Sequence, residues 1–374
     1  MSEGSITRRG KKSWRIKYDL PRDETGERRI AYKTVKGTRK DAEKEKRRLM
    51  TAIDKGVHVD PSALTVADYL DQWLADVAPA SVGPKALERY RGLVKKQIKP
   101  HIGTTQLQKL RPADIAAWLQ ALGKTEISIR SIQHAHGVLR TALAHAAAVE
   151  IIERNVATFI KPPTMLRTEV EILNAEQIAD ALRKLEGHSI YPIAALAIGT
   201  GARRGELTAL RWDDLDLAAA TVRIERSVEQ TKDGLRVKPP KTAAGRRTVS
   251  LPALTVKALR DHRRQTLELR LQLGIGALPG DEPVFGDIDG NWPTPHSITK
   301  CWRRAVQSRG LPRITFHSLR HSHASALIAA GLDVVTVSRR LGHASPALTL
   351  STYSHLFTNS DDKAAAAIDA ALSQ

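Results

Sequence analysis

The pattern of apolar and polar positions changes its period along the chain, beginning with strict alternation near the amino terminus. Apolar and polar residues alternate over residues 13–20 and again over residues 29–35, with a turn containing Pro and Gly between the two runs. Alternation with a period of two predicts a β-hairpin. Thr38 and Asp41 then form a capping pattern, which predicts a helix that runs through a basic stretch to Gly56.

The next segment, residues 64–160, has the periodicity of amphipathic helices. It opens with a second capping pattern, Thr65 with Asp68, and an apolar stripe follows at helical spacing. We expect interruptions at residues 100–103 and at Gly123, because proline and glycine disfavour a continuous helix. Further helices are predicted at residues 86–97, 112–122 and 128–148. A Pro-stiffened linker is predicted after them, at residues 161–164.

The third segment runs from residue 169 to residue 374 and mixes helical periodicity with short alternating runs. Asn174 predicts a helix start. The alternation over residues 221–228 predicts a strand, and residues 235–251 predict a turn followed by another strand. An Ala-rich helix is predicted over residues 361–372, and its apolar face requires cover. The chain is therefore predicted to be a mainly α, multidomain protein with small antiparallel β-sheets.

Composition favours an anionic partner. The chain carries 59 Lys plus Arg against 40 Asp plus Glu, a formal net charge of +19 and a pI near 10.1. Residues 1–60 hold 18 basic and 10 acidic side chains, so the excess is concentrated on the hairpin and its helix. Cationic residues displace counterions from a phosphate backbone, which makes nucleic acid the favoured partner, although a basic ribosomal or membrane-surface protein would show the same balance.

Cysteine usage and hydropathy point to a soluble protein of the cytoplasm. Cys301 is the one cysteine of the chain, which excludes an intramolecular disulfide and a cysteine-based zinc cluster. The basic amino terminus is followed by no apolar run, so no signal peptide is indicated. No stretch approaches the roughly 20 apolar residues that a membrane span requires.

Two short polar motifs in apolar helical surroundings carry the candidate chemistry. His317 and Arg320 lie three positions apart, so a helix would place both on one face, where they can hold the same anion. Arginine presents a permanently charged fork that matches phosphate. Arg203 follows a glycine turn and is expected in the first turn of a helix, with Glu206 three residues later as its ion-pair partner.

Three further residues complete the candidate set. Tyr353 can act as a nucleophile once its phenol is deprotonated in a strongly cationic pocket. Lys241 lies in the predicted turn between strands, where a lysine can reach a leaving oxygen and donate a proton. His343 follows a Leu-Gly pair near the end of a predicted helix.

A zinc site at His317, His321 and His323 is disfavoured, because Arg320 lies between these histidines and no cysteine pair completes a ligand set. His321, His323 and His355 are interpreted as surface or packed residues. No Gly-x-x-x-x-Gly-Lys phosphate loop is present, so nothing in the sequence indicates the use of ATP. No cofactor or metal is expected.

The order of these motifs along the chain resembles that of the tyrosine recombinases, the phage integrase family. The resemblance implies that Arg203 and Arg320 hold the scissile phosphate and that Tyr353 attacks phosphorus to give a 3′-phosphotyrosyl link. It implies that Lys241 protonates the departing 5′-oxygen, that His317 assists proton transfer and that Glu206 is a buttress. His343 would donate a further hydrogen bond to the phosphate.

The resemblance also implies an organisation and a set of partners. Residues 1–60 would be an arm-type DNA-binding module of ββ(β)α type, residues 64–160 a helical, SAM-like core-binding domain, and residues 169–374 an α+β catalytic domain. The partner would be double-stranded DNA at core and arm attachment sites. A homotetramer would assemble on the DNA, with the 361–372 helix docked on a neighbouring subunit. A directionality factor and a DNA-bending host protein are candidate accessory partners, and the location would be the nucleoid.

Two alternatives remain at this stage. A type IB topoisomerase-like strand transferase uses the same residues as a monomer, but it needs no amino-terminal arm module. A non-catalytic DNA-binding regulator would keep the basic surfaces. Such a regulator would have no use for a complete set of Arg203, Lys241, Arg320 and Tyr353.

Overall fold

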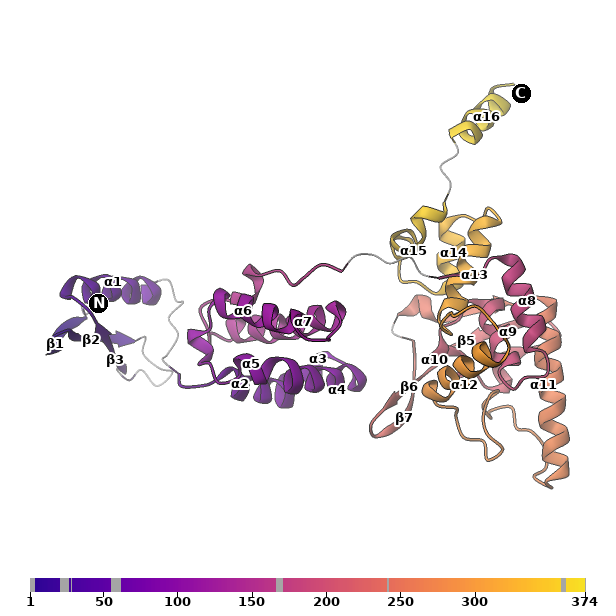
Figure 1. The fold of residues 1–374 in the computed structure, drawn as a ribbon, viewed down its shortest axis with the longest axis horizontal. Helices are drawn as coiled ribbons and strands as arrows, with labels where there is room; N and C mark the ends of the chain where they lie inside the picture. The colour runs from indigo at the N-terminus through magenta and orange to yellow at the C-terminus, as the bar shows by residue number, and fades with distance from the viewer. Residues whose placement is uncertain are drawn as a thin grey trace. The chain divides into compact units, whose positions relative to one another are not determined.

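A computed structural model of the chain describes residues 4–20, 27, 29–54, 62–165, 171–240, 242–357 and 361–373. Its helices and strands are labelled in Figure 1. The chain folds into two compact units, residues 1–166 (unit 1) and residues 167–374 (unit 2). The predicted fold class is confirmed, since unit 1 joins a small antiparallel sheet to a bundle of helices and unit 2 is an α+β unit.

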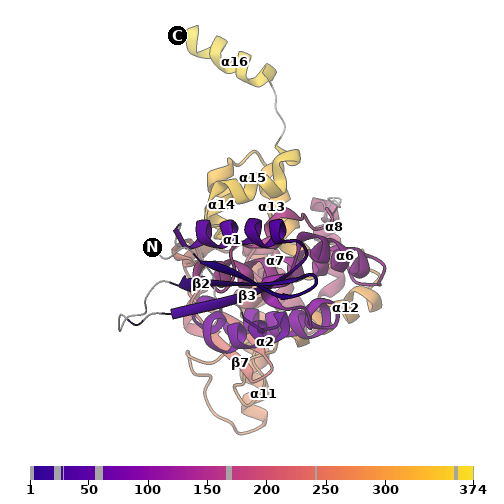
Figure 2. The ribbon, with the colours of Figure 1, turned by 90° about the vertical axis from the view of Figure 1, so that its left-hand side faces the viewer.

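Unit 1 begins with a three-stranded antiparallel sheet in the order β1-β2-β3. One helix, α1, lies over one face of this sheet (Figure 2). The predicted cap is present, because the backbone N–H of Thr38 donates to Asp41 at 2.8 Å and the N–H of Asp41 donates to the Thr38 hydroxyl at 3.3 Å. Gly56, the predicted end of this helix, lies outside the described residues. The elements are β1 (Ser5–Gly10), β2 (Ser13–Leu20), β3 (Arg29–Lys36) and α1 (Arg39–Asp54).

The two faces of this sheet differ in chemistry, as the alternating sequence predicts. Ile16 and Tyr18 point to the covered face, where they pack with Leu49 of α1, and all three are at most 5% exposed. The opposite face carries Arg15 and Tyr32, and the Arg15 guanidinium lies 5.5 Å from the centre of the Tyr32 ring. Because Tyr32 is 55% exposed, this face offers a cation and an aromatic surface to solvent.

The remainder of unit 1 is helical and has its own apolar core. The predicted stripe is buried, with Leu70 and Trp73 at most 2% exposed. Thr65 caps α2 through a capping box with Asp68, as predicted. The helical elements are α2 (Val66–Gln72), η1 (Trp73–Val77), α3 (Ala78–Ser81), α4 (Pro84–Leu93), η2 (Val94–Ile98), α5 (Lys99–Ile102), η3 (Leu107–Lys109), α6 (Pro112–Gly123), α7 (Ile129–Ala148) and η4 (Val156–Phe159).

The predicted interruption at residues 100–103 begins too early, because the chain stays helical through Pro100 and leaves the helix only after Ile102, at Gly103. The turn before the proline, η2, is a π-helical turn in which the N–H of Lys99 donates to the carbonyl of Val94, five residues earlier. This wider turn accommodates a ring that would collide with the preceding carbonyl of an α-helix. The same arrangement precedes Pro79.

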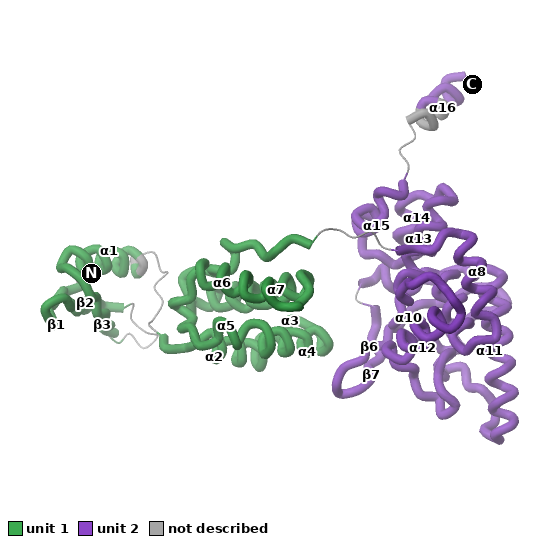
Figure 3. Tube along the Cα trace, in the orientation of Figure 1, with its two compact units in different colours: residues 1–166 green, residues 167–374 purple. Residues whose placement is uncertain are grey.

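Unit 2, purple in Figure 3, is built around α9, whose residues are almost all buried. The helices α8, α11 and α13 pack against α9, and a three-stranded sheet in the order β4-β5-β8 completes the main core. Asn174 caps α8, as predicted. The first elements are α8 (Ala175–Leu185), α9 (Tyr191–Thr200), α10 (Arg204–Leu207), η5 (Trp212–Asp214), β4 (Leu215–Asp216), β5 (Thr221–Ile224), β6 (Ser227–Thr231), β7 (Gly234–Lys238), η6 (Ala243–Gly245) and β8 (Arg247–Ser250).

The single strand predicted over residues 221–228 is wrong, since the chain changes sheets at residues 225 and 226. Strand β5 pairs with β8, whereas β6 pairs with β7 in a separate hairpin. At the change, Nη2 of Arg226 contacts both carboxylate oxygens of Asp214, at 2.5 and 2.6 Å. Asp214 is 3% exposed, so this ion pair is buried on the side of the carboxylate. It holds the chain at residue 226, in the middle of the run whose alternation continues without a break.

The carboxyl-terminal part of unit 2 is helical and returns to the start of α10. Helix α13 packs on both α9 and α14, and α14 packs on α15. A small second core holds these helices together and includes Leu341 and Tyr353. The predicted Ala-rich helix is present as α16. The elements are α11 (Ala253–Gln272), α12 (Pro295–Ser308), α13 (Ser318–Ala329), α14 (Val334–Leu341), α15 (Pro346–Tyr353), η7 (Ser354–Leu356) and α16 (Asp361–Leu372).

Candidate active site

Arg203 and Glu206 meet as their spacing predicts, although Arg203 precedes the helix and does not lie in its first turn. It is the N-cap of the four-residue helix α10. Its Nη1 donates to Oε1 of Glu206 at 2.8 Å, and its backbone N–H donates to Oε2 at 2.9 Å. The side chain of Arg203 is 42% exposed, whereas that of Glu206 is 3% exposed, so the pair joins a buried carboxylate to a guanidinium that solvent reaches.

A second arginine, Arg247 of β8, binds the same carboxylate. Its Nη2 donates to Oε2 of Glu206 at 3.0 Å, and its side chain is 7% exposed. Burial opposes ionisation of Glu206, but Arg247 and Arg203 overcome that effect and hold the pKa of Glu206 below its ordinary value. Glu206 is therefore a buried carboxylate that aligns two guanidiniums.

Arg320 of α13 brings a third guanidinium to this place. Its Nη1 donates to the carbonyl of Gly201 at 2.7 Å, two residues before Arg203. Burial, and then the charge of Arg203, lower the pKa of Arg320 to about 9, so the side chain is still a cation at neutral pH. Its Nη2 is buried and makes no hydrogen bond to the described residues. Arg203, Arg247 and Arg320, with Glu206, form what we call the arginine cluster.

Two glycines make this convergence possible. Gly201 and Gly342 end α9 and α14 with φ of +64° and +68°, a left-handed conformation that side chains disfavour. A Cβ on Gly201 would lie 2.5 Å from the His323 ring, and one on Gly342 would lie 2.6 Å from Nη1 of Arg247. The backbone therefore turns at both helix ends in space that only hydrogen can fill.

His343 joins the arginine cluster through the turn at Gly342. Nη2 of Arg203 donates to the carbonyl of Gly342 at 3.2 Å, which places the next residue beside the guanidinium. Nδ1 of His343 shares a hydrogen bond of 2.7 Å with the buried hydroxyl of Thr349. Burial, followed by the charges of Arg320 and Arg203, lowers the pKa of His343 to about 4. At neutral pH the ring is neutral, and a Thr349 hydroxyl that donates to Nδ1 leaves the proton on Nε2.

Tyr353 lies at the end of α15 with 3% of its surface exposed. Its hydroxyl shares a hydrogen bond of 2.7 Å with Nδ1 of His321, whose ring also lies edge-on to His317 at a centroid distance of 5.0 Å. Burial raises the pKa of Tyr353 to about 12, and Arg320 acts against that rise. His317 has a pKa lowered to about 4 by its enclosure in the protein and then by His321 and Arg320.

Five of the six predicted catalytic residues thus lie in one part of unit 2. Arg203 and Arg320 interact electrostatically, so the two guanidiniums can meet a single anion. His317, His343 and Tyr353 surround them. Lys241 lies outside the described residues, between β7 and the η6 turn, and its assignment stays a prediction.

Sequence reasoning missed two residues of the site. Arg247 is separated from Glu206 by 41 positions, and its strand carries no spacing signal that identifies the contact. His321 was interpreted as a surface or packed residue, yet it contacts the Tyr353 hydroxyl directly. The available signal was its spacing of four from His317, because residues four positions apart share a face of a helix.

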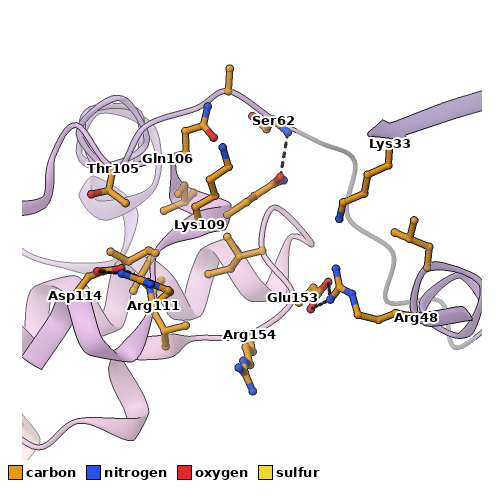
Figure 4. A pocket seen from close by; sticks show the side chains of 18 of the residues that line it. Lys33, Arg48, Ser62, Thr105, Gln106, Lys109, Arg111, Asp114, Glu153 and Arg154 are labelled. Atoms are coloured by element: carbon orange, nitrogen blue, oxygen red, sulfur yellow. Dashed lines mark hydrogen bonds and ion pairs between the residues drawn. The ribbon is translucent and has the colours of Figure 1, made fainter. Parts of the chain in front are cut away.

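Other candidate sites receive little support. Within the described ranges, no group of three His, Cys, Asp or Glu side chains is placed to hold a metal ion. The histidines near Arg320 are among the residues searched. None of the described helices combines the length and apolar character that crossing a lipid bilayer requires. A hollow in unit 1 has basic residues along its lining (Figure 4), but Arg48 is paired with Glu153 at 3.2 Å and Arg111 with Asp114 at 2.9 Å.

Two family models match the chain. The model described as "Phage integrase family" covers residues 170–360, which include every residue of the arginine cluster, His321 and Tyr353. The model described as "Phage integrase, N-terminal SAM-like domain" covers residues 65–123, within the helical part of unit 1.

Curated relatives extend over nearly the whole chain. A "Tyrosine recombinase XerC-like" protein of Caldanaerobacter subterraneus subsp. tengcongensis is 28% identical over 371 residues, which are 94% of this chain and 94% of that protein. The ICEBs1 integrase of Bacillus subtilis is 26% identical over 351 residues, 92% of this chain and 93% of that protein.

Solved structures share the fold. The Tn1549 transposon integrase in complex with transposon right end DNA aligns with a TM-score of 0.67 and 19% identity, over 82% of this chain and 98% of that chain. A lambda integrase tetramer bound to a Holliday junction aligns with a TM-score of 0.57 and 18% identity, over 91% and 96%. With a family model that spans more than half of its length, the chain belongs to the phage integrase family and is a tyrosine-type site-specific recombinase.

Proposed function

We propose that the arginine cluster and Tyr353 cleave and rejoin DNA strands through a 3′-phosphotyrosyl intermediate during integration and excision of a mobile element. The observation that carries this proposal is the meeting of three guanidiniums beside the buried phenol of Tyr353, two of them on the Glu206 carboxylate and the third, Arg320, on the Gly201 carbonyl. Three cations against one carboxylate leave net positive charge where a phosphodiester would lie. A buried, preorganised charge of this kind stabilises the negative charge that builds on phosphorus in the transition state.

Arg203 and Arg320 hold the two non-bridging oxygens in this proposal. Arg203 has solvent access, and Arg320 keeps a buried Nη2 that is unpaired among the described residues. A phosphate oxygen would satisfy that nitrogen, whose desolvation otherwise costs about 1–3 kcal/mol. Glu206 acts as a buttress, since it touches both Arg203 and Arg247 and keeps their forks fixed.

The remaining residues manage protons. Lys241 protonates the departing 5′-oxygen, and His317 assists that transfer. His343 donates from Nε2 to the phosphate, because its Nδ1 is occupied by Thr349. The chemistry uses no cofactor, since guanidiniums supply the positive charge. The phosphotyrosyl bond retains the energy of the phosphodiester, so a second 5′-hydroxyl can reverse the step on a new partner.

We propose the following assembly and partners. Residues 1–60 bind arm sites through the sheet face that carries Arg15 and Tyr32, residues 64–160 bind the core site, and residues 169–374 are catalytic. Exchange between two duplexes requires four active sites, and a lambda integrase tetramer has been seen on a Holliday junction. A homotetramer on DNA, with α16 docked on a neighbour, meets that need. The protein would act at the nucleoid in the cytoplasm, where a directionality factor and a DNA-bending host protein would set its direction.

A covalent trapping experiment tests the chemistry. A nicked duplex that carries the attachment core loses its 5′-end after cleavage, so the wild-type adduct accumulates. Tyr353→Phe should bind the duplex with wild-type affinity and form no adduct on a denaturing gel. Tyr191→Phe, in the same unit, serves as the matched control and should form adduct normally. Adduct formation by Tyr353→Phe equal to the wild type would refute the assignment.

A further inference from the structure

The hydroxyl of Tyr353 has a specific partner that the roles above do not use. Oη of Tyr353 lies 2.7 Å from Nδ1 of His321, and the two ring centres lie 5.6 Å apart. Tyr353 is 3% exposed, so water has little access to its proton. A buried phenol with a pKa of about 12 is protonated at neutral pH and cannot attack phosphorus until the proton has somewhere to go.

We propose that His321 is the general base that accepts the phenolic proton of Tyr353 as the tyrosine attacks DNA. This inference rests on the proposed function and adds a catalytic residue to it. The proton passes from Oη to Nδ1 of His321 while an oxygen lone pair forms the bond to phosphorus. The bond between phosphorus and the 5′-oxygen breaks, and the departing oxygen takes its proton from Lys241 or His317. In the reverse step, the imidazolium returns its proton to the tyrosine.

His321 is held in the state that a base requires. Burial, followed by the positive charge of Arg320, lowers the pKa of His321, so its imidazole is neutral at neutral pH. Acceptance at Nδ1 requires the tautomer with its proton on Nε2. The charged and titratable groups on or at the ends of the helices around His321 are His317, Arg320, His323, Asp333, Arg339, Arg340, His343, Tyr353 and His355. The one carboxylate among them, Asp333, binds the first turn of α14, and the charge that acts on His321 is that of Arg320, so a protonated His321 readily returns its proton.

Geometry favours His321 over His317 as the base. His321 lies on α13, four positions after the N-cap residue His317, and the two rings are nearly perpendicular at 88°. Only His321 is within hydrogen-bond distance of the tyrosine among the described residues. Arg320, between them, favours the ionised form of Tyr353 and so reduces the energy of the attacking phenolate. His317 is left for the leaving group.

A purely positioning role for the same hydrogen bond predicts a different outcome with asparagine. Oδ1 of asparagine reaches about the same position as Nδ1 of histidine and accepts a hydrogen bond, but it does not take up a proton near neutral pH. His321→Asn therefore keeps the alignment of Tyr353 and removes the base. His321→Ala removes both and leaves room for added imidazole.

The experiment measures single-turnover cleavage of the nicked core duplex at saturating protein, with bound DNA quantified separately. At pH 7, His321→Asn and His321→Ala should both bind DNA normally and cleave about 10²–10⁴-fold more slowly than the wild type, the range for loss of a general base. Added imidazole should accelerate the alanine variant. The exposed His296, replaced by alanine, is the control and should cleave like the wild type.

The pH profile and a sulfur-substituted substrate distinguish a base from an acid. Both His321 variants should cleave faster as pH rises, about tenfold per unit, because hydroxide replaces the lost base, while the wild-type rate stays level above neutrality. A duplex with sulfur in place of the bridging 5′-oxygen has a leaving group that needs no proton. The variants should remain slow on it if His321 acts on the tyrosine, whereas recovery on this substrate would assign His321 to the leaving group and overturn the proposal.

Failure of this inference is distinguishable from failure of the proposed function. If the wild type forms its adduct at Tyr353 and His321→Asn cleaves within about threefold of it at pH 7, His321 positions the tyrosine and is not its base. If the wild type forms no adduct at Tyr353, the proposed function itself is wrong. Lower thermal stability of His321→Ala without imidazole rescue, together with a normal rate for His321→Asn, would identify a structural role.

Discussion

Replacement of Arg247 by methionine should destabilise unit 2 and slow DNA cleavage, although Arg247 contacts no atom that reacts. Arg247 joins three segments. Its Nη2 binds Glu206 at 3.0 Å, its Nε donates to the carbonyl of Arg340 at 2.8 Å, and its Nη1 donates to the carbonyl of Gly245 at 3.1 Å. The residue thus ties α10 to the end of α14, where Gly342 and His343 follow.

The structure sets the size of the effect. Methionine keeps most of the side-chain volume, so little packing is lost, but Glu206 is left 3% exposed with Arg203 as its remaining guanidinium. Removal of one partner of a buried ion pair costs about 3–5 kcal/mol. For a unit of this size, each kcal/mol lowers the midpoint of thermal unfolding by about 2–4 °C, which gives a decrease of about 6–20 °C.

Calorimetry and circular dichroism of the full chain measure the unfolding midpoint, and the nicked duplex measures cleavage. Arg246→Met is the matched control, because Arg246 precedes Arg247 and is exposed. A surface substitution of this kind should change stability by no more than about 0.5 kcal/mol. Arg247→Lys should be intermediate, since an ammonium cannot reproduce the three-donor fork. An Arg247→Met protein that melts within about 2 °C of the wild type and cleaves normally would refute the reasoning.

Two further predictions concern the glycine turn and acid pH. Gly201→Ala should destabilise the protein by more than the about 1–2 kcal/mol of a left-handed alanine and should reduce cleavage, because the new Cβ would meet the His323 ring and shift the carbonyl that binds Arg320. Gly331→Ala, with φ of +82° in open space, carries the backbone cost alone, so equal unfolding midpoints for the two variants would contradict the steric argument. Since the pKa values of His323 and His343 are lowered to about 4 from an ordinary 6.5, the unfolded chain binds protons that the folded chain refuses. Stability that is fully present above about pH 6.5 should therefore be lost as the pH falls toward 4, and unchanged unfolding midpoints between pH 7 and pH 5 would argue against these shifts.

Local features of the fold could be predicted from the sequence because their causes lie within a few residues. The capping pairs at Thr38, Thr65 and Asn174 all form as predicted, since a side chain three positions away satisfies the free amide of a helix start. Glu206 accepts from the backbone N–H of Arg203 for the same reason. Spacing therefore predicts contacts along one turn of a helix.

Contacts between distant segments could not be predicted in the same way. Residues 221–228 alternate without a break, yet the two halves belong to different sheets, and the ion pair between Arg226 and Asp214 lies at the change. Pro100 stays within a helix because a π-helical turn precedes it. Alternation did predict strand structure, but it could not show the change of sheet. Proline does disfavour an α-helix, but a π-helical turn before it, which is rare, accommodates the ring.

The candidate site shows the same division. Its members could be named from motif order, but the partner of the nucleophile could not, because the contact between His321 and Tyr353 depends on how α14 and α15 return to α13. His321 shares a helix face with His317, but that spacing does not show which histidine contacts the tyrosine. Only the folded chain separates His321 from His355, which lies near the same tyrosine in sequence and is exposed.

The positive charge of the site also determines how bound DNA would change the protonation of the groups around it. Burial, followed by Arg320, Arg203 and Arg247, depresses the pKa of His343, and burial, followed by His321 and Arg320, depresses that of His317. The site without DNA therefore holds neutral imidazoles beside cations. A bound phosphodiester brings a negative charge that offsets those cations, and it raises the pKa of each imidazole near it. It also raises the pKa of the Tyr353 phenol, because it offsets Arg320, so proton transfer from Tyr353 to His321 stays uphill until the bond to phosphorus forms. The nucleophile would therefore stay protonated until it attacks phosphorus, and it would not accumulate as a phenolate away from DNA.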